Sequence, residues 1–354
     1  MNKSSQPLVS VVTPVYNDEE FLAECIESVL AQTYQNWDYA IVDNCSTDRS
    51  NAIAHQYAAK DPRIRVYENR EYLKVIPNHN HALRQISPAS KYCKMVFADD
   101  WMFPECLEKM VAVAEGHASV GLVGAYGLRG RQIIFSGLAY PSTIVDGREL
   151  CREFFLEQLR IFGSATNVLY RSDLVRGNDP FFNEANLHAD TEACVALLRK
   201  CDFGFVHQVL TFSREQASSL NAMSVDLATN YASMLHDLVT YGPDYLTPDE
   251  LELCLQRHLT AYYRYLGRNL LLNRGEKFWD FHRRKMAAVG IRLSRLRVAG
   301  GLLGALGDAV LNPKESIGRL LKRRHALKFA ALKQNQRREP IGLHAKRQSQ
   351  NENS

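Results

Sequence analysis

Apolar and polar positions follow two alternating periods along the first hundred residues. Segment 8–15 is apolar or β-branched at nearly every position, as in a strand that is covered on both faces, and the apolar positions of 21–30 then share one helical face. The same order recurs, which predicts strands at 37–42, 64–67 and 94–97 and helices at 52–57 and 78–86. This alternation predicts an α/β domain with a mostly parallel sheet and helices on both faces.

Beyond residue 100 the alternation loosens. The pattern predicts a helix at 104–115, strands at 120–126, 166–170 and 203–211, a hairpin around 132–135 and a helix at 190–199. From about residue 224 the signals are helical only, at 231–241, 248–272 and 278–289. We therefore expect a sheet-based domain over 1–223, a helical extension over 224–311 and a basic, partly disordered tail over 312–354.

Composition excludes several classes of protein. Of the 354 residues 46% are hydrophobic and 23% are charged, so the chain fits neither a disordered nor a fibrous protein. The longest apolar candidate, 298–311, is interrupted by four glycines and an aspartate, and no apolar run of signal-peptide length precedes the first strand. The eight cysteines form no CxxC pair. We expect a cytoplasmic protein with reduced, mostly buried thiols and no transmembrane anchor.

Three predicted strands end in polar loops. The first ends at 13–17 (Thr-Pro-Val-Tyr-Asn), the second at 43–48 (Asp-Asn-Cys-Ser-Thr-Asp) and the fourth at 98–100 (Ala-Asp-Asp). Ligands of open α/β sheets bind outside the carboxyl ends of the strands, so these loops are candidates for a nucleotide site. The first βα turn has no GxGxxG and the chain has no GxxxxGK[ST]. Carboxylates, rather than a glycine-rich loop, are expected to bind the ligand.

These three motifs, in this order and spacing, resemble the inverting GT-A glycosyltransferases of family 2, over roughly residues 8–215. The resemblance implies a GT-A-like, Rossmann-type nucleotide-binding domain. It implies a nucleotide-sugar donor, UDP-linked as in much of the family, and an acceptor hydroxyl on a saccharide or lipid-linked molecule of polysaccharide or glycolipid biosynthesis. The residues it assigns to the donor nucleotide are Thr13, Pro14, Val15, Tyr16, Asn17, Asp43 and Asp99.

The resemblance also implies a divalent cation, Mn²⁺ or Mg²⁺. Asp99 and Asp100 stand where the family has its DXD-type pair, with Asp100 as the direct ligand. A hard cation neutralises the departing diphosphate, which is otherwise a poor leaving group. Relatives often add a histidine near the end of the domain, where this chain has Gln216, and His207 is the alternative.

An inverting transfer also needs a base that takes the proton of the acceptor hydroxyl. The segment 188–192 (His-Ala-Asp-Thr-Glu) resembles the acidic motif that carries this base, which we assign to Asp190, with Glu192 as second choice. Segment 163–167 resembles segments beside the acceptor, and Trp101 is an accessory candidate.

Each of these residues also has a structural interpretation. Asn17 or Asp18 can cap the helix that follows, Asp43 and Asp48 suit turns and helix caps, and Asp190 can cap its own helix. Two other functional classes remain open at this point. A non-catalytic nucleotide-sugar binder or scaffold could keep the fold, and a nucleotidyltransferase would release pyrophosphate instead of a nucleoside diphosphate.

Charge is divided unevenly along the chain. Residues 291–354 hold 14 Lys and Arg against four acidic residues, whereas the rest holds 29 against 35. The basic region could lie on an anionic membrane at the inner face of the cell membrane, contact nucleic acid or simply be solvated. We expect peripheral membrane contact and no nucleic-acid partner.

Overall fold

The computed structural model describes residues 6–214, 227–272 and 274–311. The chain divides into two compact units, one of residues up to Leu259 with Glu276–Leu293 and the other of Thr260–Gly275 with the residues from Ser294 onward. The expected domain boundary at residue 223 falls outside the described residues and stays a prediction. The basic tail over 312–354 and Gln216 lie outside them as well.

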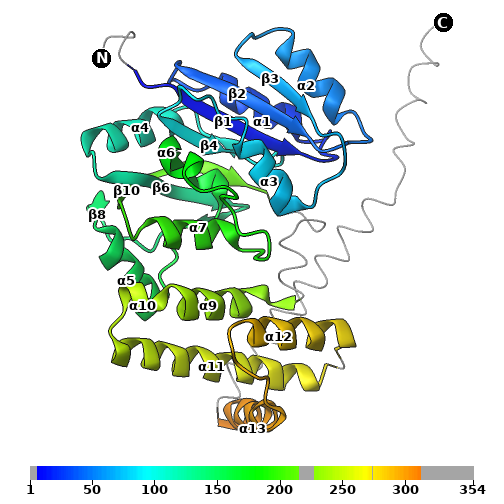
Figure 1. Ribbon diagram of the computed structural model, residues 1–354, viewed down its shortest axis with the longest axis vertical. Helices are drawn as coiled ribbons and strands as arrows, with labels where there is room; N and C mark the ends of the chain where they lie inside the picture. The colour runs from blue at the N-terminus through cyan, green and yellow to red at the C-terminus, as the bar shows by residue number, and fades with distance from the viewer. Residues whose placement is uncertain (1–5, 215–226, 273, 312–354) are drawn as a thin grey trace, which may run out of the picture. The chain divides into compact units, whose positions relative to one another are not determined.

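Within the described part of the first unit, one mixed sheet of ten strands forms the centre (Figure 1). Its order is β3-β2-β1-β4-β9-β6-β10-β5, with β7 beside β6 and β8 beside β10. Strands β3, β2, β1 and β4 are parallel, β9 is antiparallel to both its neighbours, and β6 is parallel to β10. The strands are β1 (Val9–Val15), β2 (Trp37–Asp43), β3 (Ile64–Glu68), β4 (Tyr92–Met95), β5 (Trp101–Met102), β6 (Val120–Arg129), β7 (Gln132–Ile134), β8 (Ile144–Val145), β9 (Val168–Arg171) and β10 (Asp202–Ser213). The predicted α/β class with a mostly parallel sheet is confirmed.

A separate hydrophobic core fills each face of the sheet. Helices α1 (Leu22–Leu30), α2 (Ser50–Ala58) and α4 (Cys106–Gly116) contribute to one core, and α3 (Val75–Leu83), α5 (Gly147–Glu157) and α7 (Ala189–Leu197) contribute to the other. Successive side chains of a strand point to opposite faces, so Val11 of β1 lies in the first core and Val12 in the second. This double coverage explains why the sequence of β1 is apolar almost throughout.

Several elements escaped the sequence pattern. Helix α5 begins after Asp146, whose carboxylate accepts a hydrogen bond from the Glu149 N–H at 2.9 Å. The Asp-Gly-Arg-Glu run was therefore a readable capping signal. The strand predicted at 166–170 is shorter, because a 3₁₀ turn, η2 (Ala165–Asn167), precedes β9.

The predicted helical extension is confirmed. It contains α9 (Thr229–Thr240), α10 (Gly242–Tyr245), α11 (Pro248–Leu270), α12 (Glu276–Ala288) and α13 (Arg295–Leu311), and the short α6 (Ser172–Arg176) follows β9. Over the described residues no helix combines the length and apolar character that crossing a membrane requires.

Helix α13 forms despite its glycines, and the second unit shows why one of them is needed. A Cβ on Gly301 would lie 2.2 Å from the backbone oxygen of Tyr263, and one on Gly267 would lie 2.3 Å from the nitrogen of Leu302. Both glycines therefore permit close contact between the backbones of α11 and α13. Close packing outweighs the helix-weakening tendency that glycine has in isolation.

Candidate active site

The first polar loop contributes fewer exposed side chains than the sequence suggested. Thr13, Pro14 and Val15 are buried, and the Thr13 hydroxyl lies 2.8 Å from the Tyr39 hydroxyl in the core. Tyr16 is 44% exposed and its ring lies 4.9 Å from that of Tyr72, which is also exposed. Tyr16 and Tyr72 can therefore contact a planar ligand, and Tyr72 was missed because no motif surrounds it.

Hydrogen bonds join the loop that follows β1 to the loop that follows β2. The Asn17 side chain accepts a hydrogen bond from the Thr47 N–H at 2.8 Å, and the Asn17 N–H donates to the Ser46 hydroxyl at 3.0 Å. Helix α1 starts at Leu22 and its N-cap residue, Phe21, makes no side-chain cap, whereas the Asn17 side chain bonds to Thr47 and the Asp18 carbonyl oxygen accepts from the Leu22 N–H at 2.9 Å. Asn17 instead has a left-handed backbone (φ 54°) that joins the loops.

Asp48 behaves largely as expected for a residue beside a helix start. Its carboxylate accepts hydrogen bonds from the Ser50 N–H at 2.9 Å, in the first turn of α2, and from the Glu19 N–H at 3.0 Å. These bonds lower the pKa of Asp48 against the opposing effect of its burial. Asp48 therefore stabilises the loop pair.

Asp43 retains an unsatisfied acceptor at the end of β2. It is 4% exposed, and its Oδ2 accepts from the Ser46 N–H at 3.1 Å, but its buried Oδ1 has no hydrogen-bond partner. Leaving a buried carboxylate oxygen unpaired costs free energy unless a ligand donates to it. Val15 pairs with Asp43 across β1 and β2, so the oxygen lies beside the Tyr16 loop. A nucleobase N–H or a ribose hydroxyl would satisfy it.

Asp99 and Asp100 follow β4 at the same edge of the sheet. Asp100 is 4% exposed, and its Oδ2 accepts hydrogen bonds from the hydroxyls of Thr166 at 2.7 Å and Ser213 at 3.3 Å. Its Oδ1 accepts from the Arg214 N–H at 3.1 Å. Burial, and then the neighbouring Asp99, raise the pKa of Asp100 to about 7. Burial likewise raises the pKa of Asp99.

These two carboxyl groups fit a hard cation. Two adjacent, poorly solvated carboxylates repel each other, and a bound cation relieves that repulsion as a proton would. The three donors to Asp100 fix its orientation and leave it further acceptor capacity, since a carboxylate has about four lone-pair sites. The donor set consists of oxygens, which Mg²⁺ and Mn²⁺ prefer.

A buried lysine contacts the residue that orients Asp100. Lys94 of β4 is fully buried, and its ammonium donates to the Thr166 carbonyl oxygen at 2.6 Å. Thr166 also accepts a hydrogen bond from the Phe97 N–H at 3.2 Å through the hydroxyl that bonds Asp100. Lys94 and Thr166 thus hold Asp100 in one orientation.

Arg214 adds a positive group beside the acidic pair. Its guanidinium donates to the Asp99 carbonyl oxygen at 3.2 Å, forms an ion pair with Glu24 and lies 4.2 Å from the centre of the Phe21 ring. A guanidinium in this place can contact phosphate oxygens. The sequence pattern around it drew attention to Gln216 instead of to Arg214.

Asp190 lies in the first turn of α7, as predicted, and is partly exposed. Burial of its carboxyl group raises its pKa to about 7, against the opposing effects of hydrogen bonding and of Arg129. Arg129 pairs with Ser213 across β6 and β10, and Ser213 donates to Asp100. The charge of Arg129 thus acts on Asp190, and Arg129 lies beside the strand residue that bonds Asp100.

Glu192 lies in a different environment. Its carboxylate accepts hydrogen bonds from Asn183, Asn186 and Tyr241 and contacts His236 at 3.2 Å. Its burial acts to raise its pKa, but these partners together lower it to about 2. A carboxylate so strongly stabilised is a weak proton acceptor, so Asp190 is the better candidate base.

The remaining candidate residues are buried or contact other groups of the protein. The ring of Trp101 is stacked on Phe212 with centroids 5.0 Å apart, so one face of it is covered. Thr166 and Asn167 of the expected acceptor segment are buried. His207 uses both ring nitrogens, contacting the Tyr126 hydroxyl at 2.8 Å and the Ser142 carbonyl oxygen at 2.7 Å, so neither nitrogen is free to bind a metal.

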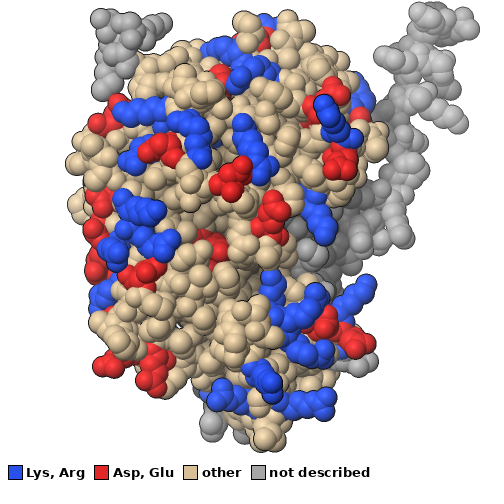
Figure 2. All heavy atoms as spheres, viewed as in Figure 1, with Lys and Arg blue, Asp and Glu red and all other residues tan. Residues whose placement is uncertain are grey.

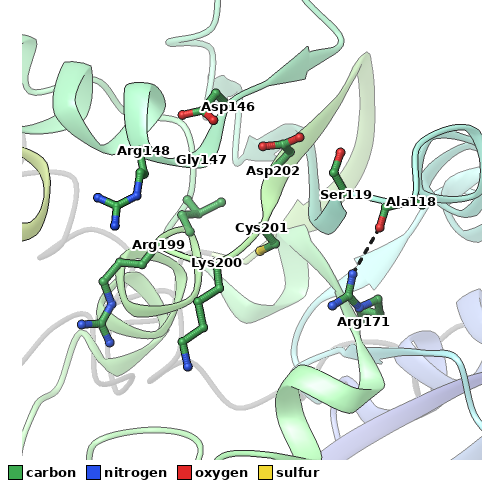
Figure 3. Close-up of a pocket in the computed structure, with 11 residues that line it drawn as sticks. Ala118, Ser119, Asp146, Gly147, Arg148, Arg171, Arg199, Lys200, Cys201 and Asp202 are labelled. Atoms are coloured by element: carbon green, nitrogen blue, oxygen red, sulfur yellow. Dashed lines mark hydrogen bonds between the residues drawn. The ribbon is translucent and has the colours of Figure 1, made fainter.

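A separate hollow of about 380 Å³ lies at the opposite edge of the sheet, where β6 and β10 begin (Figure 3). Its lining includes Arg148, Arg171, Arg199 and Lys200. Arg199 forms an ion pair with Asp244 at 2.8 Å, and the long side chains of Arg199 and Lys200 point away from Arg171 in Figure 3. Because its cations do not converge, this hollow is not the candidate active site.

The surface of the sheet-bearing part is mixed in charge. Figure 2 shows Lys and Arg side chains interspersed with Asp and Glu over the viewed face. The expected basic region is mostly outside the described residues, so its membrane contact stays a prediction.

Part of this chain is similar in sequence to known glycosyltransferases. Residues 10–176 match the family model described as Glycosyl transferase family 2. EpsE of Bacillus subtilis (strain 168), which is named as a glycosyltransferase, is 36% identical over 42% of this chain and 55% of its own length. The poly(ribitol-phosphate) beta-N-acetylglucosaminyltransferase TarS of Staphylococcus aureus (strain MW2) is 28% identical over 49% of this chain and 29% of its own length. The chain thus spans about half or less of these relatives.

This chain is also similar to TarS in fold. The crystal structure of S. aureus TarS 1-349 in complex with UDP-GlcNAc superposes with a TM-score of 0.61 at 17% identity, over 85% of this chain and 88% of that one. At this identity the likeness concerns the fold alone, which is the GT-A fold with a helical C-terminal part. Residues 10–176 are thus similar in sequence to glycosyl transferase family 2, and the chain is similar in fold to TarS.

Proposed function

We propose that this protein is an inverting glycosyltransferase that moves a sugar from a nucleotide-sugar donor, UDP-linked in our proposal, to an acceptor hydroxyl in polysaccharide or glycolipid biosynthesis. The proposal rests mainly on the positions of three acidic side chains. The unpaired Oδ1 of Asp43 and the acidic pair Asp99 and Asp100 lie at the same edge of the sheet. That arrangement suits a nucleoside diphosphate, with a hydrogen-bond acceptor for the nucleoside and carboxylates near the diphosphate. The family match and the fold shared with TarS support it.

Asp100, with Asp99 beside it, would hold a divalent cation, Mn²⁺ or Mg²⁺, which when bound would neutralise the charge of the leaving diphosphate. Arg214 would add a fixed positive charge near the same oxygens. Asp43 would accept a hydrogen bond from the nucleoside, and Tyr16 and Tyr72 would border it.

Asp190 would act as the general base. The acceptor hydroxyl would donate its proton to the Asp190 carboxylate while its oxygen attacks the anomeric carbon, and the bond from that carbon to the diphosphate oxygen would break in the same step. Inversion follows because the attack comes from the face opposite the leaving group. The N-terminal turn of α7 holds the carboxylate, with the Thr191 N–H donating to its Oδ1 at 2.8 Å.

Asp190→Asn tests the base. This substitution keeps the shape of the side chain but removes its basicity, so we expect transfer to fall by about 100-fold or more while donor binding changes little. The assay measures release of nucleoside diphosphate from a panel of nucleotide-sugars with mixed saccharide and lipid-linked acceptors, and calorimetry measures donor affinity. Release of pyrophosphate instead would indicate a nucleotidyltransferase.

A matched control is Asp179→Asn. Asp179 is exposed and paired with Arg84 away from the site, so this variant should keep wild-type transfer. Normal turnover by Asp190→Asn would contradict the assignment of the base. Donor binding without release of any product, by the wild-type chain, would instead indicate a nucleotide-sugar binder.

A further inference from the structure

A second cluster of potential metal ligands lies between α7 and α9, apart from the acidic pair at the sheet edge. It consists of Glu192 on α7 and the consecutive residues His236 and Asp237 on α9, and one potential ligand atom from each lies within 4.8 Å of the others. Glu192 and Asp237 are buried, with 4% and 1% exposure. Carboxylate oxygens and an imidazole nitrogen are ligands that Zn²⁺ and other transition-metal ions take in proteins.

An unpaired buried oxygen points to a missing ligand. The Oδ1 of Asp237 has no hydrogen-bond partner although it is shielded from solvent. An orphan carboxylate oxygen is costly in a protein interior, and the neighbouring Glu192 makes a second negative charge there more costly still. A bound cation would satisfy this oxygen and balance both carboxylates.

The distances also suit a cation. The Nε2 of His236 lies 3.2 Å from the Oε1 of Glu192. Two ligand atoms that share a tetrahedral ion at about 2.1 Å from each are about 3.4 Å apart, so these two need move little. The ligand atom of Asp237 lies within 4.8 Å of the other two, so closing it onto the ion would require a shift of about 1.4 Å at most.

The surroundings hold the proposed ligands in place. Asn183 and Asn186 donate to Glu192 at 3.0 Å and 2.7 Å, and Tyr241 donates to it at 3.0 Å. Groups of this kind fix the direction of a ligating carboxylate. The side chain of His236 is 33% exposed, which gives an ion a route into the cluster and room for a water as fourth ligand.

We propose that Glu192, His236 and Asp237 form a binding site for a first-row divalent transition ion such as Zn²⁺, which fastens α9 to the helix that carries Asp190. This site is separate from the cation proposed at Asp100 and does not depend on the proposed transferase activity. The mixed nitrogen and oxygen donors favour Zn²⁺ over Mg²⁺, because Mg²⁺ prefers oxygen ligands in octahedral geometry.

The test uses the full chain with Asp100→Asn, which removes the other candidate site. After dialysis against Zn²⁺, elemental analysis should find one ion per chain, and Zn²⁺ should raise the melting temperature because it binds the native state. Adding Asp237→Asn or His236→Gln should weaken Zn²⁺ binding by about 100-fold or more, since losing even a group that only orients a ligand costs about 10- to 100-fold.

The matched control adds Asp244→Asn, which changes an exposed carboxylate on α10 and should leave Zn²⁺ binding unchanged. Melting in EDTA shows whether each variant is folded, and Asp237→Asn should melt no lower than its parent because it removes an unpaired carboxylate. If that variant fails to fold, His236→Gln, at the partly exposed position, carries the test. Absence of Zn²⁺ from the Asp100→Asn chain, or full retention in folded Asp237→Asn or His236→Gln, would overturn the proposal.

Discussion

We expect His79 to lower the free energy of unfolding at acidic pH. Its ring is stacked on Phe97, with centroids 4.9 Å apart, and meets Phe182 edge-on. Burial among these rings disfavours the charged imidazolium and lowers the pKa of His79 to about 4, from 6.5. The folded protein therefore keeps His79 neutral at pH values where the unfolded chain binds a proton.

The direction and size of this pH effect on the free energy of unfolding follow from the difference in proton binding between the folded and unfolded states. Above pH 6.5 both states hold a neutral imidazole, so His79 costs nothing. As pH falls from 6.5 toward 4, the unfolded state binds the proton first and the free energy of unfolding decreases. One pKa unit corresponds to about 1.4 kcal/mol, so the loss is about 2 kcal/mol at pH 5 and about 3 kcal/mol at pH 4. Because His79 is only partly buried, these are upper values.

Urea unfolding of the wild-type chain and of His79→Gln, at pH 7.5 and pH 5, measures this term. The variant has no imidazole at this position, so its free energy of unfolding should decrease less between the two pH values, by about 2 kcal/mol. Other titrating groups act in both proteins and cancel in the difference. Equal pH dependence in the two proteins would show that His79 is protonated in the folded state, or equally solvated in both states, and would refute the reasoning.

Two further substitutions test the packing that positions the site. Thr166→Val removes the hydroxyl that donates to Asp100 at 2.7 Å and should lower stability by about 2 kcal/mol and weaken cation-dependent donor binding by about tenfold. Calorimetry with and without EDTA measures this, Thr166→Ser should retain binding, and unchanged affinity in the valine variant would contradict the role of the hydroxyl. Gly301→Ala places a Cβ 2.2 Å from the Tyr263 backbone oxygen and should destabilise the α11 and α13 contact by about 1–3 kcal/mol, measured by hydrogen exchange of those helices. Gly300→Ala, where a Cβ meets nothing within 4 Å, should not increase exchange, and equal effects of both alanines would count against the close contact.

The amino-acid sequence by itself determined the α/β class and the loops that follow β1, β2 and β4. These signals are local. A strand covered on both faces must be apolar throughout, and polar residues must follow where it leaves the sheet. The acidic positions Asp43, Asp99 and Asp100 could be selected for the same reason, because parallel neighbouring strands end at one edge.

Only the tertiary structure decided how individual side chains are used. Thr13 lies in the predicted loop, yet its hydroxyl is buried against Tyr39, whereas Tyr72 from a distant segment lies beside Tyr16. Contacts between remote segments, such as that of Arg214 with Asp99, have no periodic signature in the sequence.

The tertiary structure also decided how easily individual carboxyl groups ionise and why helix α13 contains glycine. Whether a carboxyl group is easily ionised depends on its burial and on partners brought by other elements, which is why Asp190 and Glu192, two residues apart, have pKa values shifted in opposite directions. The glycines of α13 suggest a broken helix when read along the chain, but Gly301 allows α13 to pack closely on α11. Periodicity is a property of neighbours along the chain, whereas solvation and close packing depend on neighbours in space.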